Sequence, residues 1–190
     1  MKDLLSIVSH FQLQGTVQEI NPLGAGLIND TYKVSTLEAD APDYVLQRIN
    51  HAIFQNVEML QANINAVTTH IRKKLEEKGE KDIERKVLHF FPADTGKTYW
   101  HDGESYWRVM AFIPNARTYE TVNPEYSYYA GVAFGNFQAM LADIPDKLGE
   151  TIPDFHNMEF RLKQLRDAVA ADAAGRVKAV SYTHLRAHET

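Results

Sequence analysis

The feature that most constrains this fold is a pair of closely spaced glycines between segments of alternating apolar and polar residues. Gly24 and Gly26 precede residues 31–34 and 44–49, which have the alternation typical of strands. Glycine lets backbone N–H groups approach an anion closely. We therefore interpret residues 23–48 as a hairpin able to hold a phosphate, although an ordinary β-turn explains the two glycines equally well.

A dinucleotide-binding loop explains this stretch less well. Asn29 stands where a third glycine would complete the G-x-G-x-x-G pattern. That pattern must also open a helix within a βαβ unit, whereas the residues that follow here predict a strand. The strand-loop-strand order is instead the arrangement that kinases use over the phosphates of ATP.

Composition narrows the class of partner. The 190 residues carry a net charge of −5 with acidic and basic residues interspersed, so neither nucleic acid nor a membrane surface is an expected partner. The absence of cysteine excludes disulfides and thiolate metal sites. His184 and His188 are spaced by four residues, but they lie in a C-terminal stretch that we interpret below as a non-native tail, and the other histidines lack the paired spacing of a metal site. No apolar run is long enough for a membrane span. We expect a cytoplasmic protein with a small-molecule partner, and the oligomeric state stays open.

The apolar spacing predicts strands, then a helix, more strands and further helices. A period of three and four predicts a long helix with Asn50 as its cap and Gly79 as its stop. Asp102 precedes a glycine, and we interpret it as a turn residue. The other expected elements are helices at 3–11, 124–143 and 160–173, and strands at 14–20, 31–36, 44–49, 87–91, 97–100 and 105–113.

Four stretches in the same order resemble a known group. They are residues 24–34 (GAGLINDTYKV), 44–50 (YVLQRIN) with Phe54, 107–113 (WRVMAFI) and 152–157 (IPDFHN). They resemble the aminoglycoside phosphotransferase and choline kinase-like superfamily, and within it the N-acetylhexosamine 1-kinase-like proteins. The resemblance implies an α+β, protein-kinase-like fold. Its smaller, nucleotide-binding lobe would span 1–113 with a five-stranded antiparallel sheet and a helix, and 114–179 would hold the hinge connector and the start of a helical larger lobe.

The resemblance also implies the residues that would bind ATP. Backbone groups and short side chains of the glycine loop would hold its phosphates, and the end of the last strand would meet adenine. On the third strand, Gln47 takes the place of the kinase lysine while Arg48 is the adjacent cation, and only one of the two can face the nucleotide. The implied set is Gly24, Ala25, Gly26, Asn29, Thr31, Gln47, Arg48, Glu58, Ala111, Phe112 and Ile113.

Several of these residues have an ordinary structural explanation as well. Glu58 would pair with the strand cation, but a solvated helix glutamate is equally expected. Residues 111–113 could simply end a core strand, and His156 is best explained by hydrogen bonds within its own loop. Leu27 and Asp30 are the residues here that would touch the substrate.

The implied activity is ATP-dependent transfer of a phosphoryl group to the anomeric hydroxyl of an N-acetylhexosamine, with magnesium. Alternatives are an aminoglycoside or amino-alcohol substrate, or a non-catalytic nucleotide-binding or interaction module. Residues 1–190 contain no H-x-D-x-x-x-x-N loop, so we assign no catalytic residue in this chain, expect the magnesium ligands outside it and predict an inactive fragment. Residues 180–190 resemble a translated sequencing adapter, and we interpret them as a non-native tail.

Overall fold

The computed structural model describes residues 3–24, 26–119 and 121–177. Contacts divide the chain into two compact units, 1–151 and 152–190. Residues 114–151 thus belong to the same unit as the N-terminal sheet. The division between lobes that we predict after residue 113 stays a prediction, and the predicted tail at 180–190 lies outside the described residues.

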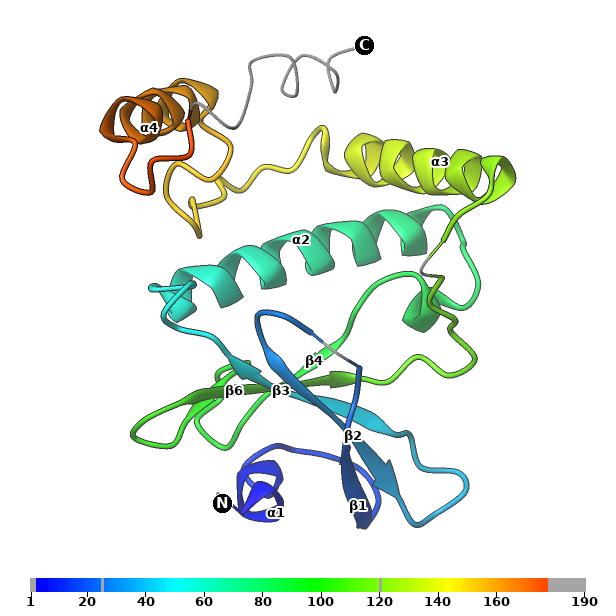
Figure 1. Cartoon of the computed structure of the whole chain (residues 1–190). Coiled ribbons are helices and arrows are strands. Elements are labelled where there is room, and N and C mark those ends of the chain that lie inside the picture. Colours follow the sequence, from blue (N-terminus) through cyan, green and yellow to red (C-terminus); the bar gives the residue numbers. More distant parts are fainter. Residues whose placement is uncertain (1–2, 25, 120, 178–190) are drawn as a thin grey trace. The chain divides into compact units, whose positions relative to one another are not determined.

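An antiparallel sheet forms the centre of the first unit (Figure 1). Its order is β1-β2-β3-β6-β4, with β5 paired to β6 beside β4. This confirms the predicted α+β class with an N-terminal antiparallel sheet. The described strands are β1 (Val17–Pro22), β2 (Asp30–Thr36), β3 (Tyr44–Ile49), β4 (Phe90–Phe91), β5 (Trp100–His101) and β6 (Tyr106–Ala111).

One face of the sheet forms the hydrophobic core. Strand alternation directs Tyr44 and Leu46 of β3 to this face, where both are fully buried. The short helix α1 (Leu4–Val8) covers them with Ile7 and Val8. Tyr44 satisfies its hydroxyl by accepting from the amide of Gln14 at 2.8 Å and donating to the Gln14 carbonyl at 3.0 Å. The same alternation directs Gln47 to the opposite face.

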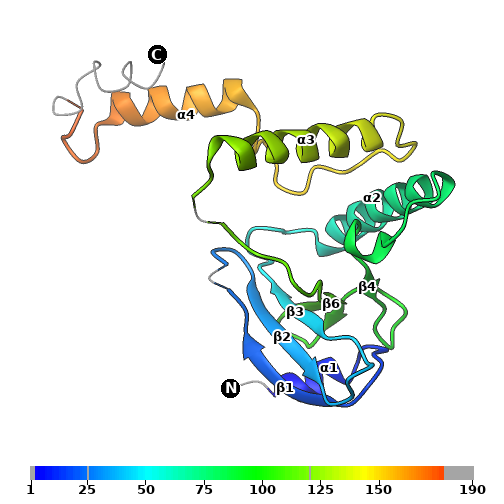
Figure 2. The same cartoon turned by 90° about the vertical axis from the view of Figure 1, so that its right-hand side faces the viewer.

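The long helix α2 (Val57–Glu77) lies on that opposite face, across the sheet from α1 (Figures 1 and 2). Our predicted cap, Asn50, is wrong, because its side chain accepts from Ala52 in a turn that precedes the helix. Asn56 caps α2 by accepting from the Met59 amide at 2.9 Å. Gly79 follows the helix with φ of +66°, as expected for a stop.

Strands β4 and β5 are shorter than the predicted segments. Val87 is buried with Ile71 and Leu75 of α2 and not in the sheet. A short 3₁₀ helix, Ile83–Arg85, leads into this cluster. Asp102 is confirmed as a turn residue, because its carboxylate accepts from the amides of Glu104 and Ser105 at 2.8 and 2.7 Å.

Helix α2 also holds the chain beyond α3 (Pro124–Leu141). The side chain of Asn63 donates to the Gly149 carbonyl at 2.7 Å and accepts from its amide at 2.9 Å. Lys74 donates to the Met140 carbonyl at 2.9 Å and pairs with Asp143. Along α3 itself no described residue is buried, and Phe134 is 71% exposed. Residues 140–149 are thus fixed to α2 by polar contacts.

The second unit contains α4 (Met158–Ala171). The Asn157 side chain caps it by accepting from the Phe160 amide at 3.1 Å, and its Nδ2 atom donates to the Asp154 carboxylate at 2.8 Å. His156 lies in this loop with its ring edge-on to Phe155. None of the helices in the described ranges has the length and apolarity needed to cross a membrane.

The turn between β2 and β3 gives a pH-dependent stability prediction. Asp43 pairs with Lys33 at 2.8 Å and accepts from the Thr36 amide at 3.0 Å. The hydrogen bond from Lys33 lowers the pKa of Asp43. A lowered carboxyl pKa stabilises the fold above the unfolded-state pKa, and this stabilisation is lost as the pH falls through the folded-state pKa.

We expect Asp43→Asn to lower the free energy of unfolding by about 1 kcal/mol at pH 7, since the pair is partly exposed. The difference from the native chain should vanish in strong acid, where both forms carry a neutral side chain. Urea unfolding at a series of pH values measures this. A difference that stays constant down to strong acid would contradict it.

Candidate functional site

The glycine loop is a tightly closed hairpin between β1 and β2. The Leu23 amide donates to the Thr31 carbonyl at 2.8 Å, and Gly24 has φ of +72°, a left-handed conformation that favours glycine. A Cβ on Gly26 would lie 3.1 Å from the Asn29 carbonyl oxygen. The Asn29 side chain accepts from the Asn50 amide at 2.9 Å, which ties the loop to the end of β3. Of the predicted loop residues, Ala25 lies outside the described residues.

Beside this loop, strand register aligns three polar residues in a row. Thr31 of β2 pairs with Gln47 of β3, and Gln47 pairs with Arg108 of β6. Their neighbours Leu46 and Val109 face the core, so the row faces α2. The Gln47 Nε2 atom donates to Thr31 Oγ1 at 3.0 Å. Its Oε1 atom accepts from Nε and Nη2 of Arg108 at 3.0 and 2.9 Å.

Arg108 is a cation held next to a neutral partner. It is partly buried, and its Nη1 atom is buried with no hydrogen-bond partner. In residues 3–24, 26–119 and 121–177 it makes no ion pair. Its guanidinium lies 5.5 Å from the centre of the Phe90 ring. Burial lowers the pKa of Arg108 to about 10. An uncompensated charge of this kind is costly and marks a candidate functional site.

Arg48 has a different environment. Its Nε atom donates to Asp30 at 2.6 Å, and both side chains are about half exposed. The charge of Arg48 is thus offset by a carboxylate across the strand pair. The structure places Gln47, and not Arg48, in the row with Thr31. Asp30, one of the two predicted substrate residues, is engaged in this ion pair, and the other, Leu27, is 99% exposed in the loop.

Sequence reasoning missed Arg108 as a site residue. It is the only charged residue between Trp107 and Ile113, a stretch that otherwise consists of apolar residues. A charge inside an apolar strand was the signal that could have identified it.

The remaining predicted residues lie at the ends of these elements. Glu58, near the start of α2, pairs with Lys97 at 3.1 Å and is mostly exposed. At the predicted hinge, the Ala111 amide donates to the His89 carbonyl at 2.9 Å and the Phe112 amide donates to the Asp43 carbonyl at 3.1 Å. Ile113 follows directly. The nucleotide-binding roles of all these residues stay predictions.

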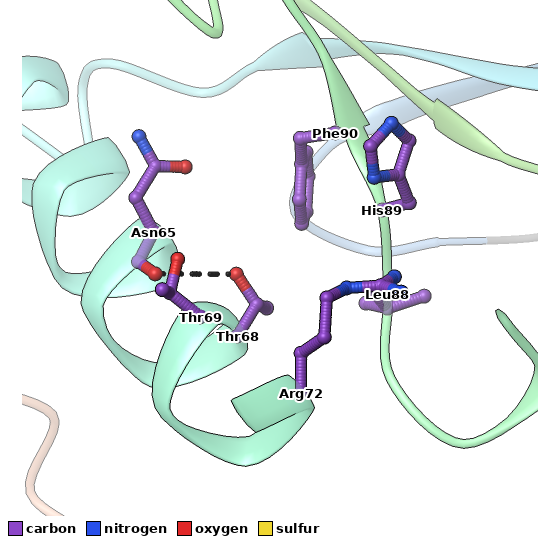
Figure 3. A pocket seen from close by; sticks show the side chains of 7 residues that line it. All are labelled: Asn65, Thr68, Thr69, Arg72, Leu88, His89 and Phe90. Atoms are coloured by element: carbon purple, nitrogen blue, oxygen red, sulfur yellow. Dashed lines mark hydrogen bonds between the residues drawn. The ribbon is translucent and has the colours of Figure 1, made fainter. Parts of the chain in front are cut away.

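A small cavity of about 260 Å³ lies between α2 and the chain leading into β4. Figure 3 shows Arg72 and three polar residues of the helix facing Leu88, His89 and Phe90. Arg72 donates to both carboxylate oxygens of Glu84 at 2.6 and 3.0 Å, so its charge is paired. The cavity shares no lining residue with the predicted nucleotide site. Across the described part of the chain, no cluster of three or more histidine, aspartate or glutamate residues could hold a metal ion.

Comparison with protein families gives a match over most of the chain. The model of the APH family, described as the phosphotransferase enzyme family, matches residues 19–187. The matched range contains the glycine loop, the polar row and the predicted hinge, and it includes part of the predicted tail. The glycine hairpin and the antiparallel sheet agree with the fold of a kinase-like phosphotransferase. This chain belongs to the APH phosphotransferase enzyme family.

Proposed function

We propose that this chain is the nucleotide-binding part of an ATP-dependent kinase that phosphorylates the anomeric hydroxyl of an N-acetylhexosamine. The family match supports a phosphotransferase. The observation that carries nucleotide binding is the row Thr31, Gln47 and Arg108, which connects an unneutralised positive charge on β6, through Gln47, to the strand that follows the glycine hairpin. Phosphoryl transfer depends mainly on positioning and on charge neutralisation, and this row offers both.

The residues present fit a nucleoside triphosphate. Gly24 and Gly26 leave backbone N–H groups open to close approach, and a side chain at Gly26 would crowd the Asn29 carbonyl. The amides of Ala111 and Phe112 are used within the fold, so we propose that adenine meets other backbone groups of 111–113. When bound, ATP supplies the transferable phosphoryl group, and magnesium neutralises its charge. In the described ranges no cluster of three or more histidine, aspartate or glutamate residues could hold a metal ion, and we propose no magnesium ligand among them.

The alternatives concern the acceptor and the activity. An aminoglycoside or amino alcohol would use the same nucleotide site, and Leu27 is the exposed loop residue that we propose near the acceptor. A binding module without transfer is favoured by one observation, the glutamine at position 47 where kinases carry lysine. Because residues 1–190 contain no H-x-D-x-x-x-x-N loop, we expect this chain to bind nucleotide without transferring phosphate.

Calorimetric titration of the 190-residue chain with ATP and with adenosine tests the nucleotide proposal. We expect ATP to bind more tightly than adenosine, because the loop and the polar row act on the phosphates. Failure of the native chain to bind ATP at millimolar concentration would contradict it. Formation of ADP and a sugar phosphate from ATP and any hexosamine would contradict the expectation of no transfer.

Acceptor choice is tested separately, by ligand-observed NMR in the presence of ATP. N-acetylhexosamines, an aminoglycoside and choline are compared at equal concentration. Selective line broadening of the N-acetylhexosamines supports the proposed acceptor. Broadening of one of the other two compounds alone would replace it.

A glycine substitution tests the loop itself. We expect Gly26→Ala to weaken ATP binding by about tenfold, because the new Cβ would lie 3.1 Å from the Asn29 carbonyl oxygen and shift the loop. Gly131→Ala is the matched control, since a Cβ there meets nothing within 4 Å and lies on α3. Equal ATP affinity of the two variants would contradict a role for the loop.

A further inference from the structure

We propose that Arg108 supplies the positive charge that attracts the nucleotide's phosphates, and that it acts through Gln47 as a positioning residue. This inference rests on the proposed nucleotide-binding function and names the source of charge that the third strand lacks. Gln47 is neutral, and the charge of Arg48 is paired with Asp30. Arg108 is the cation of this sheet face that hydrogen-bonds to Gln47.

The hydrogen bonds in the row share one direction. Arg108 donates twice to Gln47 Oε1, at 3.0 and 2.9 Å. Gln47 Nε2 then donates to Thr31 Oγ1 at 3.0 Å, and that hydroxyl lies 3.5 Å from the Asn29 carbonyl oxygen. In each of these hydrogen bonds, the donor is therefore the group nearer to Arg108 and the acceptor is the group nearer to the glycine loop. Hydrogen bonds arranged in series polarise one another, so the row extends the positive potential of Arg108 toward the loop.

The two bonds from the guanidinium also fix the orientation of the Gln47 amide. A guanidinium has only donors, so the oxygen of the amide must face Arg108. The NH₂ group consequently faces Thr31 and the loop. It has two hydrogens, and the bond to Thr31 uses one. The second is available to donate to an anion held by the loop.

A purely structural role explains Arg108 poorly. A structural cation in a partly buried strand is normally neutralised by a carboxylate, and apolar residues of similar size often serve such a position better. Within the described ranges Arg108 forms no ion pair, and Nη1 has no acceptor. The positive charge is thus retained at a cost, as expected where an anionic ligand neutralises it.

The Gln47→Glu variant separates a structural role of Arg108 from a role in attracting phosphates. Glutamate keeps the size of glutamine and can accept the same two bonds from Arg108, so the fold should be retained. It also neutralises the arginine and removes the NH₂ group that faces the loop. We expect ATP affinity to fall by about 10- to 100-fold while adenosine affinity stays unchanged, because the lost interactions are charge-assisted. Gln18→Glu, at an exposed position of β1, adds the same charge outside the row and should leave both affinities unchanged.

A double variant that moves the positive charge from position 108 to position 47 provides a rescue test. Arg108→Met alone should reduce ATP affinity by at least about tenfold. Combining it with Gln47→Lys returns a cation to the third strand, and ATP affinity should recover to within a few-fold of the native chain. Far-UV circular dichroism confirms that each variant is folded, and if Arg108→Met does not fold, the Gln47→Glu titration alone decides.

The outcomes distinguish this inference from the function on which it rests. Native ATP binding with unchanged affinity in Gln47→Glu would overturn the role of Arg108 and leave the nucleotide site intact. Equal losses of ATP and adenosine affinity would also overturn it, because they indicate a general structural effect. Absence of ATP binding by the native chain would instead refute the proposed function.

Discussion

The Gln47→Leu variant should lose about 2–3 kcal/mol of unfolding free energy, although leucine is apolar and similar in size to glutamine. Gln47 Oε1 accepts both described hydrogen bonds of Arg108. Without it, a partly buried guanidinium would be left without an acceptor, and an unpaired charge away from water is among the costliest single defects. Urea unfolding followed by circular dichroism at neutral pH measures the loss.

The double variant Gln47→Leu with Arg108→Met is the control for this prediction. Removing both polar partners leaves neither unsatisfied, and such paired replacements are often neutral. We expect the double variant to recover most of the stability that the single variant loses. A double variant as unstable as Gln47→Leu alone would show that the loss comes from packing and not from the charge of Arg108.

Leu46→Ala, one position earlier on the same strand, should destabilise the fold by about 2–5 kcal/mol through a different mechanism. Leu46 is fully buried in the core cluster on the α1 face of the sheet. Truncation there leaves a cavity that surrounding side chains fill only in part. The same urea unfolding measurement applies, and affinity for nucleotide should be unaffected in the fraction that is folded.

Leu27→Ala is the matched control for Leu46→Ala. Leu27 is 99% exposed in the glycine loop, so its truncation should change stability by less than about 0.5 kcal/mol. Similar losses in the two leucine variants would contradict the assignment of Leu46 to the core.

The regular elements of this fold were largely predictable from local pattern. Strand β3 has the predicted bounds, Tyr44–Ile49, because this segment of aromatic and aliphatic residues follows the polar turn that contains Pro42 and ends before Asn50. The cap of α2 was misplaced because Asn50 and Asn56 are equally good caps by residue type, and only the backbone turn at 50–54 decides between them. The strand predicted at 87–91 was too long because Val87 packs against α2, a contact that periodicity within the strand does not reveal.

The candidate site was less predictable, because it depends on which strands are neighbours. Alternation alone showed that Gln47 and Arg48 face opposite sides of the sheet. It did not show which of the two shares a sheet face with the polar residues that follow the glycines. The register between β2 and β3 resolves this by pairing Thr31 with Gln47. Arg108 lies 61 residues further along the chain than Gln47, and pairing of β3 with β6 is required to bring them together.

Helix α2 connects two parts of the first unit, because it makes hydrogen bonds on two of its sides. Toward the sheet, the buried Gln61 donates to the Thr98 carbonyl at 3.0 Å, just ahead of β5. On another side, Asn63 exchanges two hydrogen bonds with Gly149, and a side chain at Gly149 would collide with Met59. The helix therefore bridges residues 140–149 and the segment just ahead of β5, and a displacement of α2 would strain hydrogen bonds on both of its sides.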